Sequence, residues 1–221
     1  KPWPYTPRII LGNALKKLEE ERGMKLMVGV EAEYHLLKRD ETGKLVVAES
    51  LDTLDYPCYD ARGLTRMFDY LSTISKYMNG LGYENYANDH EDSNGQFEQN
   101  FKYAEAMTTA DRLIFFRYMV NTVAHSFGML ATFMPKPFHD LTGNGLHMNT
   151  SLWKGDENLF QLAGSKSGKD DHGLGLTSLG YNFCGGVLEH AKAMSAVTNP
   201  IVNSYKRMGV SAPNSGATWA P

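Results

Sequence analysis

The strongest constraint on the fold is the alternation of side chains between residues 26 and 36. Every second residue there is apolar or aromatic, and these residues are Leu26, Val28, Val30, Ala32, Tyr34 and Leu36. The residues between them include Glu31, Glu33 and His35. Because successive side chains of a strand point to opposite faces, this period of two predicts a β-strand. One face of the strand is expected to meet a core, and the other carries acidic groups.

The rest of the chain mixes helical and strand patterns without a regular strand–helix–strand rhythm. Apolar residues at helical spacing predict helices at about 9–22, 61–79, 109–125 and 178–196. The first should begin at Thr6–Pro7 and end at Gly23, and the third should begin at an N-cap near Thr108 and Thr109. Two strands around 83–103, a short buried strand at 129–134 and a strand at 146–153 complete the pattern. This mixture predicts an α+β fold with a curved, mainly antiparallel sheet, its acidic face concave and its helices on the convex side.

Composition excludes several functional classes. The chain has 221 residues, of which 42% are hydrophobic, so it is long enough to bury a core. Its net charge of −3 gives no basic field, and neither nucleic acid nor an anionic membrane is expected as a partner. Two cysteines form no disulfide framework and no apolar run reaches the length of a membrane span, which favours a cytoplasmic location. Both ends of the chain are expected to be cut.

Carboxylates recur at two places in the sequence. Glu31 and Glu33 are two residues apart, so on a strand they project from the same face and repel each other. Taken alone, this pair is more often a solvated strand face. Glu91 and Glu98, however, stand on either side of an Asn94–Gly95 turn, whose facing arms can converge on one point.

A glycine-rich segment supplies a further candidate ligand. The run from Thr142 to Ser151 contains Gly143 and Gly145, which permit close approach of the backbone to a ligand, and His147 begins the next strand. A lone histidine there is more often structural. With four glutamates, however, it completes a set of donors suited to Mg²⁺ or Mn²⁺.

Taken together, the motifs of this sequence resemble those of a known family, the glutamine synthetases. The motifs that carry the resemblance occur in the family's order and extend from about residue 7 to residue 207. They are Val30–Tyr34, His90–Glu98, Phe133–Phe138, Gly143–His147 and Asn199–Arg207. Asp89–Asp92 and Ser215–Trp219 are closer to the branch that includes the γ-glutamylmethylamide synthetases. The resemblance implies the half-barrel form of the sheet and makes residues 1–221 a catalytic domain truncated at both ends.

The resemblance also implies a role for each candidate residue. Glu33, Glu91 and Glu98 would bind one metal ion, which holds glutamate and the transferred phosphoryl group. Glu31 and His147 would bind a second, which neutralises the phosphates of ATP. Arg207 would grip the α-carboxylate of L-glutamate, Gly143 would offer its backbone to that substrate, and Asn149 and Ser151 would lie at the nucleotide. The implied reaction joins ammonia or a small amine to the γ-carboxylate, in a homo-oligomeric enzyme.

Three departures from the family pattern stand beside the resemblance. Asn149 replaces a second histidine, Tyr86 replaces a glutamate that contacts the nucleotide, and residues 208–215 replace a flap that closes over the ammonium site. Later arginines of the family lie beyond the end of this chain.

Three alternatives remain open from the sequence. A guanidino kinase-like phosphotransferase is opposed by the Glu31–Glu33 and Gly143–His147 motifs. A non-catalytic homologue would be expected to lose the metal carboxylates, which are present here. A proton-transfer enzyme would need only two carboxylates, fewer than this chain brings together.

Overall fold

A computed structural model describes residues 2–162, 170 and 172–208 of the chain. It divides the chain into two compact units. The first unit comprises Lys1–Gly29, Tyr103–Asp111 and Asn149–Pro200, and the second comprises Val30–Lys102, Arg112–Met148 and Ile201–Pro221. The Ser215–Trp219 motif lies outside the described residues.

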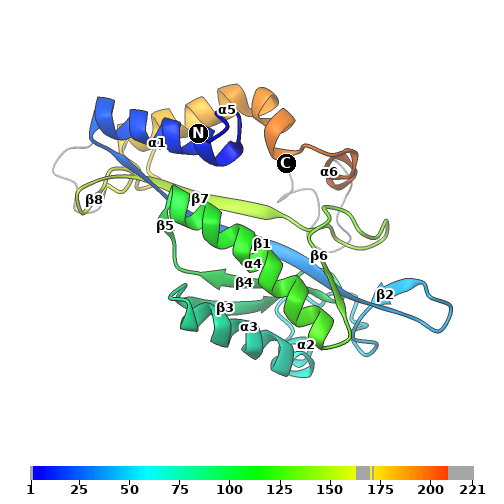
Figure 1. The fold of residues 1–221 in the computed structure, drawn as a ribbon. Coiled ribbons are helices and arrows are strands. Elements are labelled where there is room, and N and C mark those ends of the chain that lie inside the picture. Colours follow the sequence, from blue (N-terminus) through cyan, green and yellow to red (C-terminus); the bar gives the residue numbers. More distant parts are fainter. Residues whose placement is uncertain (1, 163–169, 171, 209–221) are drawn as a thin grey trace. The chain divides into compact units, whose positions relative to one another are not determined.

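Figure 1 labels the elements, which are α1 (Pro7–Arg22), β1 (Lys25–Arg39), β2 (Leu45–Val47), α2 (Ala61–Arg66), α3 (Phe68–Gly80), β3 (Asn85–His90), β4 (Gln96–Phe101), β5 (Ala104–Glu105), α4 (Ala106–Ser126), β6 (Leu130–Thr132), β7 (Leu146–Lys154), β8 (Glu157–Asn158), α5 (Ser178–Thr198) and α6 (Val202–Arg207).

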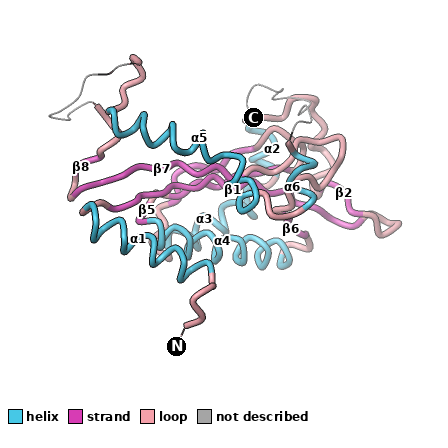
Figure 2. The backbone as a smooth tube through the Cα atoms, turned by 90° about the horizontal axis from the view of Figure 1, so that it is seen from above, coloured by secondary structure: helices cyan, strands magenta, loops and turns pink. Residues whose placement is uncertain are grey.

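The first unit contains α1, α5 and short antiparallel strand pairs. Helix α1 has proline at its start and ends at Gly23, whose φ of 62° lets its N–H donate to the carbonyl of Glu19. The first residues of β1 pair with β5, and the end of β7 pairs with β8. Seen from above in Figure 2, α5 runs alongside the first-unit part of β7.

The second unit is built around the later part of β1. This strand pairs antiparallel with β2, β4 and β6, and β4 pairs in turn with β3. On one face Tyr34 and Phe97 lie opposite each other in register and are buried, and the ring of Tyr34 packs against Phe116 of α4. Figure 1 shows α3 running beneath β3 and β4, where Ile74 and Met78 are fully buried. The alternation of residues 26–36 therefore sets the core face, as predicted.

Three expectations need correction. The helix at 61–79 is two helices, which meet at Met67. Helix α4 begins at Ala106, so Thr109 lies inside it and donates to the carbonyl of Val28 (2.8 Å) instead of capping the helix. The strand at 129–134 is shorter and leaves Leu130 exposed. The polar face of β1 is itself buried around Glu33 and His35, which are only 8% and 0% exposed.

No helix among the described residues is long and apolar enough to cross a membrane.

Candidate functional site

The acidic face of β1 continues across β4 and β3 in the second unit. Glu33 of β1 lies directly opposite Glu98 of β4, and Glu98 lies opposite Asp89 of β3. Partners in register point to the same face of a sheet, and alternation places all three on the face opposite Tyr34 and Phe97. The register of the strands therefore gathers carboxylates that are far apart in the sequence.

Glu91 follows the end of β3 and faces the same charges. Burial, and then the charges of Glu33 and Glu98, raise its pKa to about 8. Burial also raises the pKa of Glu98 to about 7, against a hydrogen bond from Asn100, and the charges of Glu33 and Glu31 add to the rise. Such shifts mark a site with surplus negative charge, in which a cation would be stabilised.

Glu33 is fixed by hydrogen bonds on both carboxylate oxygens. Its Oε2 accepts from the backbone N–H of Gly145 (2.8 Å) and from Nε2 of Gln96 (2.9 Å). Its Oε1 lies 3.3 Å from Nε2 of His147, and this hydrogen bond raises the pKa of the imidazole. Glu33 is therefore held in one orientation between β4 and the glycine-rich loop.

Both glycines of that loop lie where a side chain would collide with neighbouring protein groups. A Cβ on Gly145 would lie 2.8 Å from Oε1 of Glu33, 2.8 Å from Nε2 of His147 and 2.9 Å from Nη2 of Arg207. A Cβ on Gly143 would collide with the carbonyl of Pro135 and crowd the stem of Arg207. The backbone at Gly145 thus brings a carboxylate, an imidazole and a guanidinium together.

Helix α6 places Arg207 beside Gly145. Asn203, near the start of the helix, accepts a hydrogen bond from the N–H of Lys136 (2.7 Å) and donates to its carbonyl (3.0 Å). This two-way bond fastens α6 to the Pro135–Pro137 segment beside Gly143. The side chain of Arg207 is therefore positioned by its helix rather than free on the surface.

Sequence reasoning missed a buried amide network under the site. Besides Glu33, Nε2 of Gln96 contacts the carbonyl of Gly143 (3.0 Å) and Oδ1 of Asn144 (3.0 Å). Asn144 in turn contacts Nδ1 of His35 (2.8 Å). The only hint of this network in the sequence is that Gln96 stands two residues before Glu98, and therefore on the same face of β4.

The predicted residues fall into two groups. Glu31, Glu33, Glu91, Glu98, His147, Gly143 and Arg207 all belong to the second unit, whereas Asn149 and Ser151 belong to the first. Ser151 accepts a hydrogen bond from Nε1 of Trp153 (2.9 Å). In the described part of the chain, no three His, Cys, Asp or Glu side chains are spaced to hold a metal ion. The shared ligation of one cation by Glu33, Glu91 and Glu98 therefore stays a prediction.

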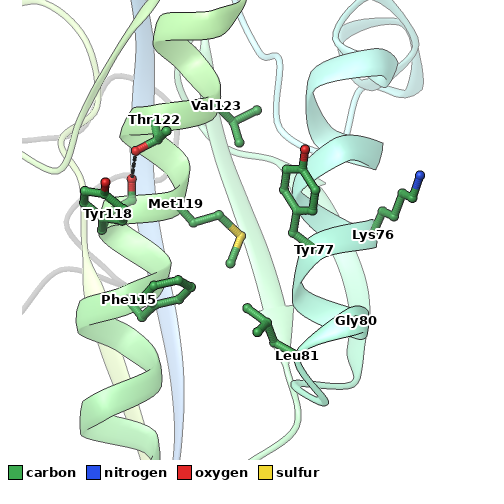
Figure 3. A pocket seen from close by; sticks show the side chains of 9 residues that line it. All are labelled: Lys76, Tyr77, Gly80, Leu81, Phe115, Tyr118, Met119, Thr122 and Val123. Carbon is green, nitrogen blue, oxygen red and sulfur yellow. Dashed lines mark hydrogen bonds between the residues drawn. The ribbon is translucent and has the colours of Figure 1, made fainter.

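A separate apolar pocket of about 560 Å³ lies between α3 and α4 of the second unit. Figure 3 shows Met119 and Phe115 of α4 facing Leu81 at the end of α3. Its lining contains no carboxylate or histidine. This pocket therefore has none of the carboxylate and imidazole groups that gather around Glu33.

Comparisons with known proteins show what the chain as a whole is similar to. A glutamine synthetase from Rhizobium leguminosarum bv. phaseoli is 42% identical over 221 residues, which are all of this chain and 49% of that protein. A glutamate–methylamine ligase from Methyloversatilis universalis is 43% identical, again over all of this chain and 48% of that protein. A solved complex of GmaS with ADP matches with a TM-score of 0.84 and 45% identity, over 95% of this chain and 46% of that one. The chain spans about half the length of the curated relatives it matches.

These likenesses confirm the expected α+β class with a mainly antiparallel sheet. The family model for the catalytic domain of glutamine synthetase matches residues 4–221, which is nearly the whole chain. The chain therefore belongs to the glutamine synthetase catalytic-domain family.

Proposed function

We propose that this protein joins ammonia or a small amine to the γ-carboxylate of L-glutamate, using ATP. The observation that carries the proposal is the meeting of Glu33, His147 and Arg207 around Gly145, beside Glu91 and Glu98. One region of the second unit thus combines groups suited to a metal ion with a group suited to a carboxylate substrate. The family membership and the activities named for the relatives support the same reaction.

The donor set fits a divalent cation. Carboxylate oxygens suit Mg²⁺, and a single imidazole makes Mn²⁺ acceptable as well. Glu33, Glu91 and Glu98 would hold one ion, and Glu31 and His147 would help to hold a second. Bound metal would neutralise charge on the phosphoryl group during transfer. The raised pKa values of Glu91 and Glu98 fit this assignment, because a cation would offset both the burial and the like-charge repulsion that raise them.

The side chains around the ions would position the substrates. The guanidinium of Arg207 is a planar, two-pronged donor that matches the α-carboxylate of glutamate. The γ-carboxylate of glutamate then attacks the terminal phosphorus of ATP, giving γ-glutamyl phosphate and ADP. The amine attacks the acyl carbon, phosphate leaves, and a proton is lost to give the amide. Asn149 and Ser151 are proposed for the nucleotide.

The acceptor amine is proposed only as a class. The glutamine synthetase and the glutamate–methylamine ligase match this chain almost equally, at 42% and 43% identity. Ammonia and methylamine are therefore the two acceptors to compare. A homo-oligomer is expected from the family resemblance.

The test is an assay of the intact protein with ATP, L-glutamate, Mn²⁺ and either ammonia or methylamine. Phosphate release and the mass of the amide product report the reaction. Glu33→Gln should lower the rate by about 10³-fold, because electrostatic stabilisation supplies most of the catalysis in phosphoryl transfer. Glu41→Gln is the matched control, since Glu41 is exposed and lies apart from the acidic face. Full activity of Glu33→Gln, or no amide from either amine, would overturn the proposal.

A further inference from the structure

A buried carboxylate outside the proposed metal site lies behind Glu91. Asp52 is 4% exposed and belongs to the loop that precedes α2. Its Oδ2 accepts from the backbone N–H of Gly95 (2.6 Å) and lies 2.7 Å from Nε2 of His90. Arg66 approaches the other oxygen at 4.0 Å. Asp52 thus bonds to both His90 at the end of β3 and Gly95 just before β4.

His90 connects Asp52 to Glu91. The imidazole is fully buried, and its Nδ1 lies 2.8 Å from the backbone carbonyl of Glu91. A carbonyl only accepts hydrogen bonds, and an ionised carboxylate does the same. Both ring nitrogens therefore face acceptors, an arrangement that an imidazolium satisfies with two N–H groups. The two residues form a buried, hydrogen-bonded pair.

Neighbouring groups hold the ring of His90 in one position. A side chain on Gly63 would overlap the ring, and Phe97 packs against it at 5.0 Å between centroids. The carbonyl of His90 accepts from the N–H of Tyr59 (2.8 Å). Tyr59 itself has a φ of 59°, an uncommon conformation for a residue other than glycine. The backbone before Glu91 is therefore fixed from several directions.

Two further contacts close the turn between β3 and β4. The N–H of Glu91 donates to the carbonyl of Gln96 (2.9 Å), and Nδ2 of Asn94 donates to the carbonyl of Leu54 (3.0 Å). The turn that separates Glu91 from Glu98 is thus bonded to the loop around Asp52 at both of its ends.

We propose that Asp52 and His90 are positioning residues, which hold the backbone of Glu91 so that its carboxylate meets Glu33 and Glu98. The inference rests on the proposed function, because it assumes that these carboxylates bind metal. A buried pair of ionisable groups is weak support for stability, since apolar residues of similar volume often serve a core equally well. Groups behind metal ligands, in contrast, tune metal affinity, and their loss typically weakens binding about 10- to 100-fold.

The experiment measures Mn²⁺ binding to the intact protein by the electron paramagnetic resonance signal of free Mn²⁺. Asp52→Asn keeps the shape of the side chain but removes its charge, and His90→Gln removes the ring. Each should weaken Mn²⁺ binding about tenfold or more. The double variant should lose little beyond the worse single one, because both changes break the same pair.

Two control variants separate positioning from general stability. Asp55→Asn removes the same charge from an exposed site on the same loop. Val120→Ala opens the buried core of α4 and should lower the melting temperature. Both should keep wild-type Mn²⁺ affinity at a temperature where the protein is folded. If Asp52→Asn does not fold, His90→Gln carries the test, with folding checked by circular dichroism.

Glu91→Gln distinguishes the two possible failures. If it weakens Mn²⁺ binding while folded Asp52→Asn and His90→Gln bind like wild type, the positioning role is wrong and the proposed metal site stands. If Glu91→Gln also binds like wild type, the metal site itself is wrong. If Val120→Ala loses as much Mn²⁺ affinity as Asp52→Asn, the Asp52–His90 pair acts only through general stability, and the positioning role is wrong.

Discussion

At the scale of single residues, the carboxylates of the second unit differ in how their charge is compensated. Glu33 receives a backbone N–H, a side-chain amide and an imidazole. Glu91 is partly buried beside other carboxylates, and its pKa is raised to about 8. Glu33 is thus ordered by the protein itself, whereas the ionised form of Glu91 opposes folding.

This difference predicts that Glu91→Gln stabilises the metal-free protein at alkaline pH. The folded-state pKa of Glu91 lies above its ordinary value of 4.5, so ionisation costs stability as pH rises from about 4.5 to 8. Glutamine carries no charge at any pH. The variant should therefore gain about 1–2 kcal/mol at pH 8.5, a figure reduced for partial exposure, and gain nothing near pH 4.5.

Urea unfolding in the presence of a chelator measures this effect at both pH values. Asp55→Asn again provides an exposed control, and it should show little dependence on pH. Equal stability of Glu91→Gln and wild type at pH 8.5 would mean that neither burial nor the neighbouring charges disfavour the ionised carboxylate.

The sequence predicted the acidic groups better than it predicted their partners. The spacing of Glu31 and Glu33 was enough to place both on one face, because strand geometry is periodic. Gln96 and Asn144 have no comparable signal, since a buried amide is recognised by what surrounds it. Asp52 and His90 meet across 38 residues, and no local pattern specifies such a pair.

At the scale of elements, the strands were more predictable than the helix boundaries. Alternation identified the core face of β1 correctly, because its apolar face is buried by α4 in the second unit. The start of α4 was placed too late because Thr108 and Thr109 resemble an N-cap. The hydroxyl of Thr109 instead bonds to β1, a tertiary contact that overrides the local preference.

This contact predicts a measurable role for Thr109 in the first unit. Its hydroxyl donates to the carbonyl of Val28 at 2.8 Å, and the side chain is 1% exposed. Thr109→Val keeps the shape but leaves that buried carbonyl short of a donor, so unfolding should become easier by about 1–2 kcal/mol. Chemical denaturation measures the change. Thr108→Val is the matched control, because Thr108 is exposed and its replacement should alter stability by less than about 0.5 kcal/mol. Equal effects of the two substitutions would show that the bond contributes nothing.

At the scale of the whole molecule, the proposed ligands divide between the two units. All five proposed metal ligands belong to the second unit, whereas Asn149 and Ser151 belong to the first. The sequence predicted a single catalytic domain and gave no sign of this division, because β1, α4 and β7 each run through the boundary. Metal and nucleotide should therefore affect different parts of the chain.

Hydrogen–deuterium exchange read by mass spectrometry tests that division. Mn²⁺ alone should slow exchange in the second unit, in peptides covering 31–36, 90–98 and 143–147, because a bound cation removes the repulsion between carboxylates. ADP added with Mn²⁺ should extend the protection to 149–153, where Asn149 and Ser151 lie. Glu33→Gln should lose the first effect, while Glu41→Gln should keep both. Protection of 149–153 by Mn²⁺ without ADP would contradict the assignment of these residues to the nucleotide, and no protection around Glu91 and Glu98 would contradict the metal site.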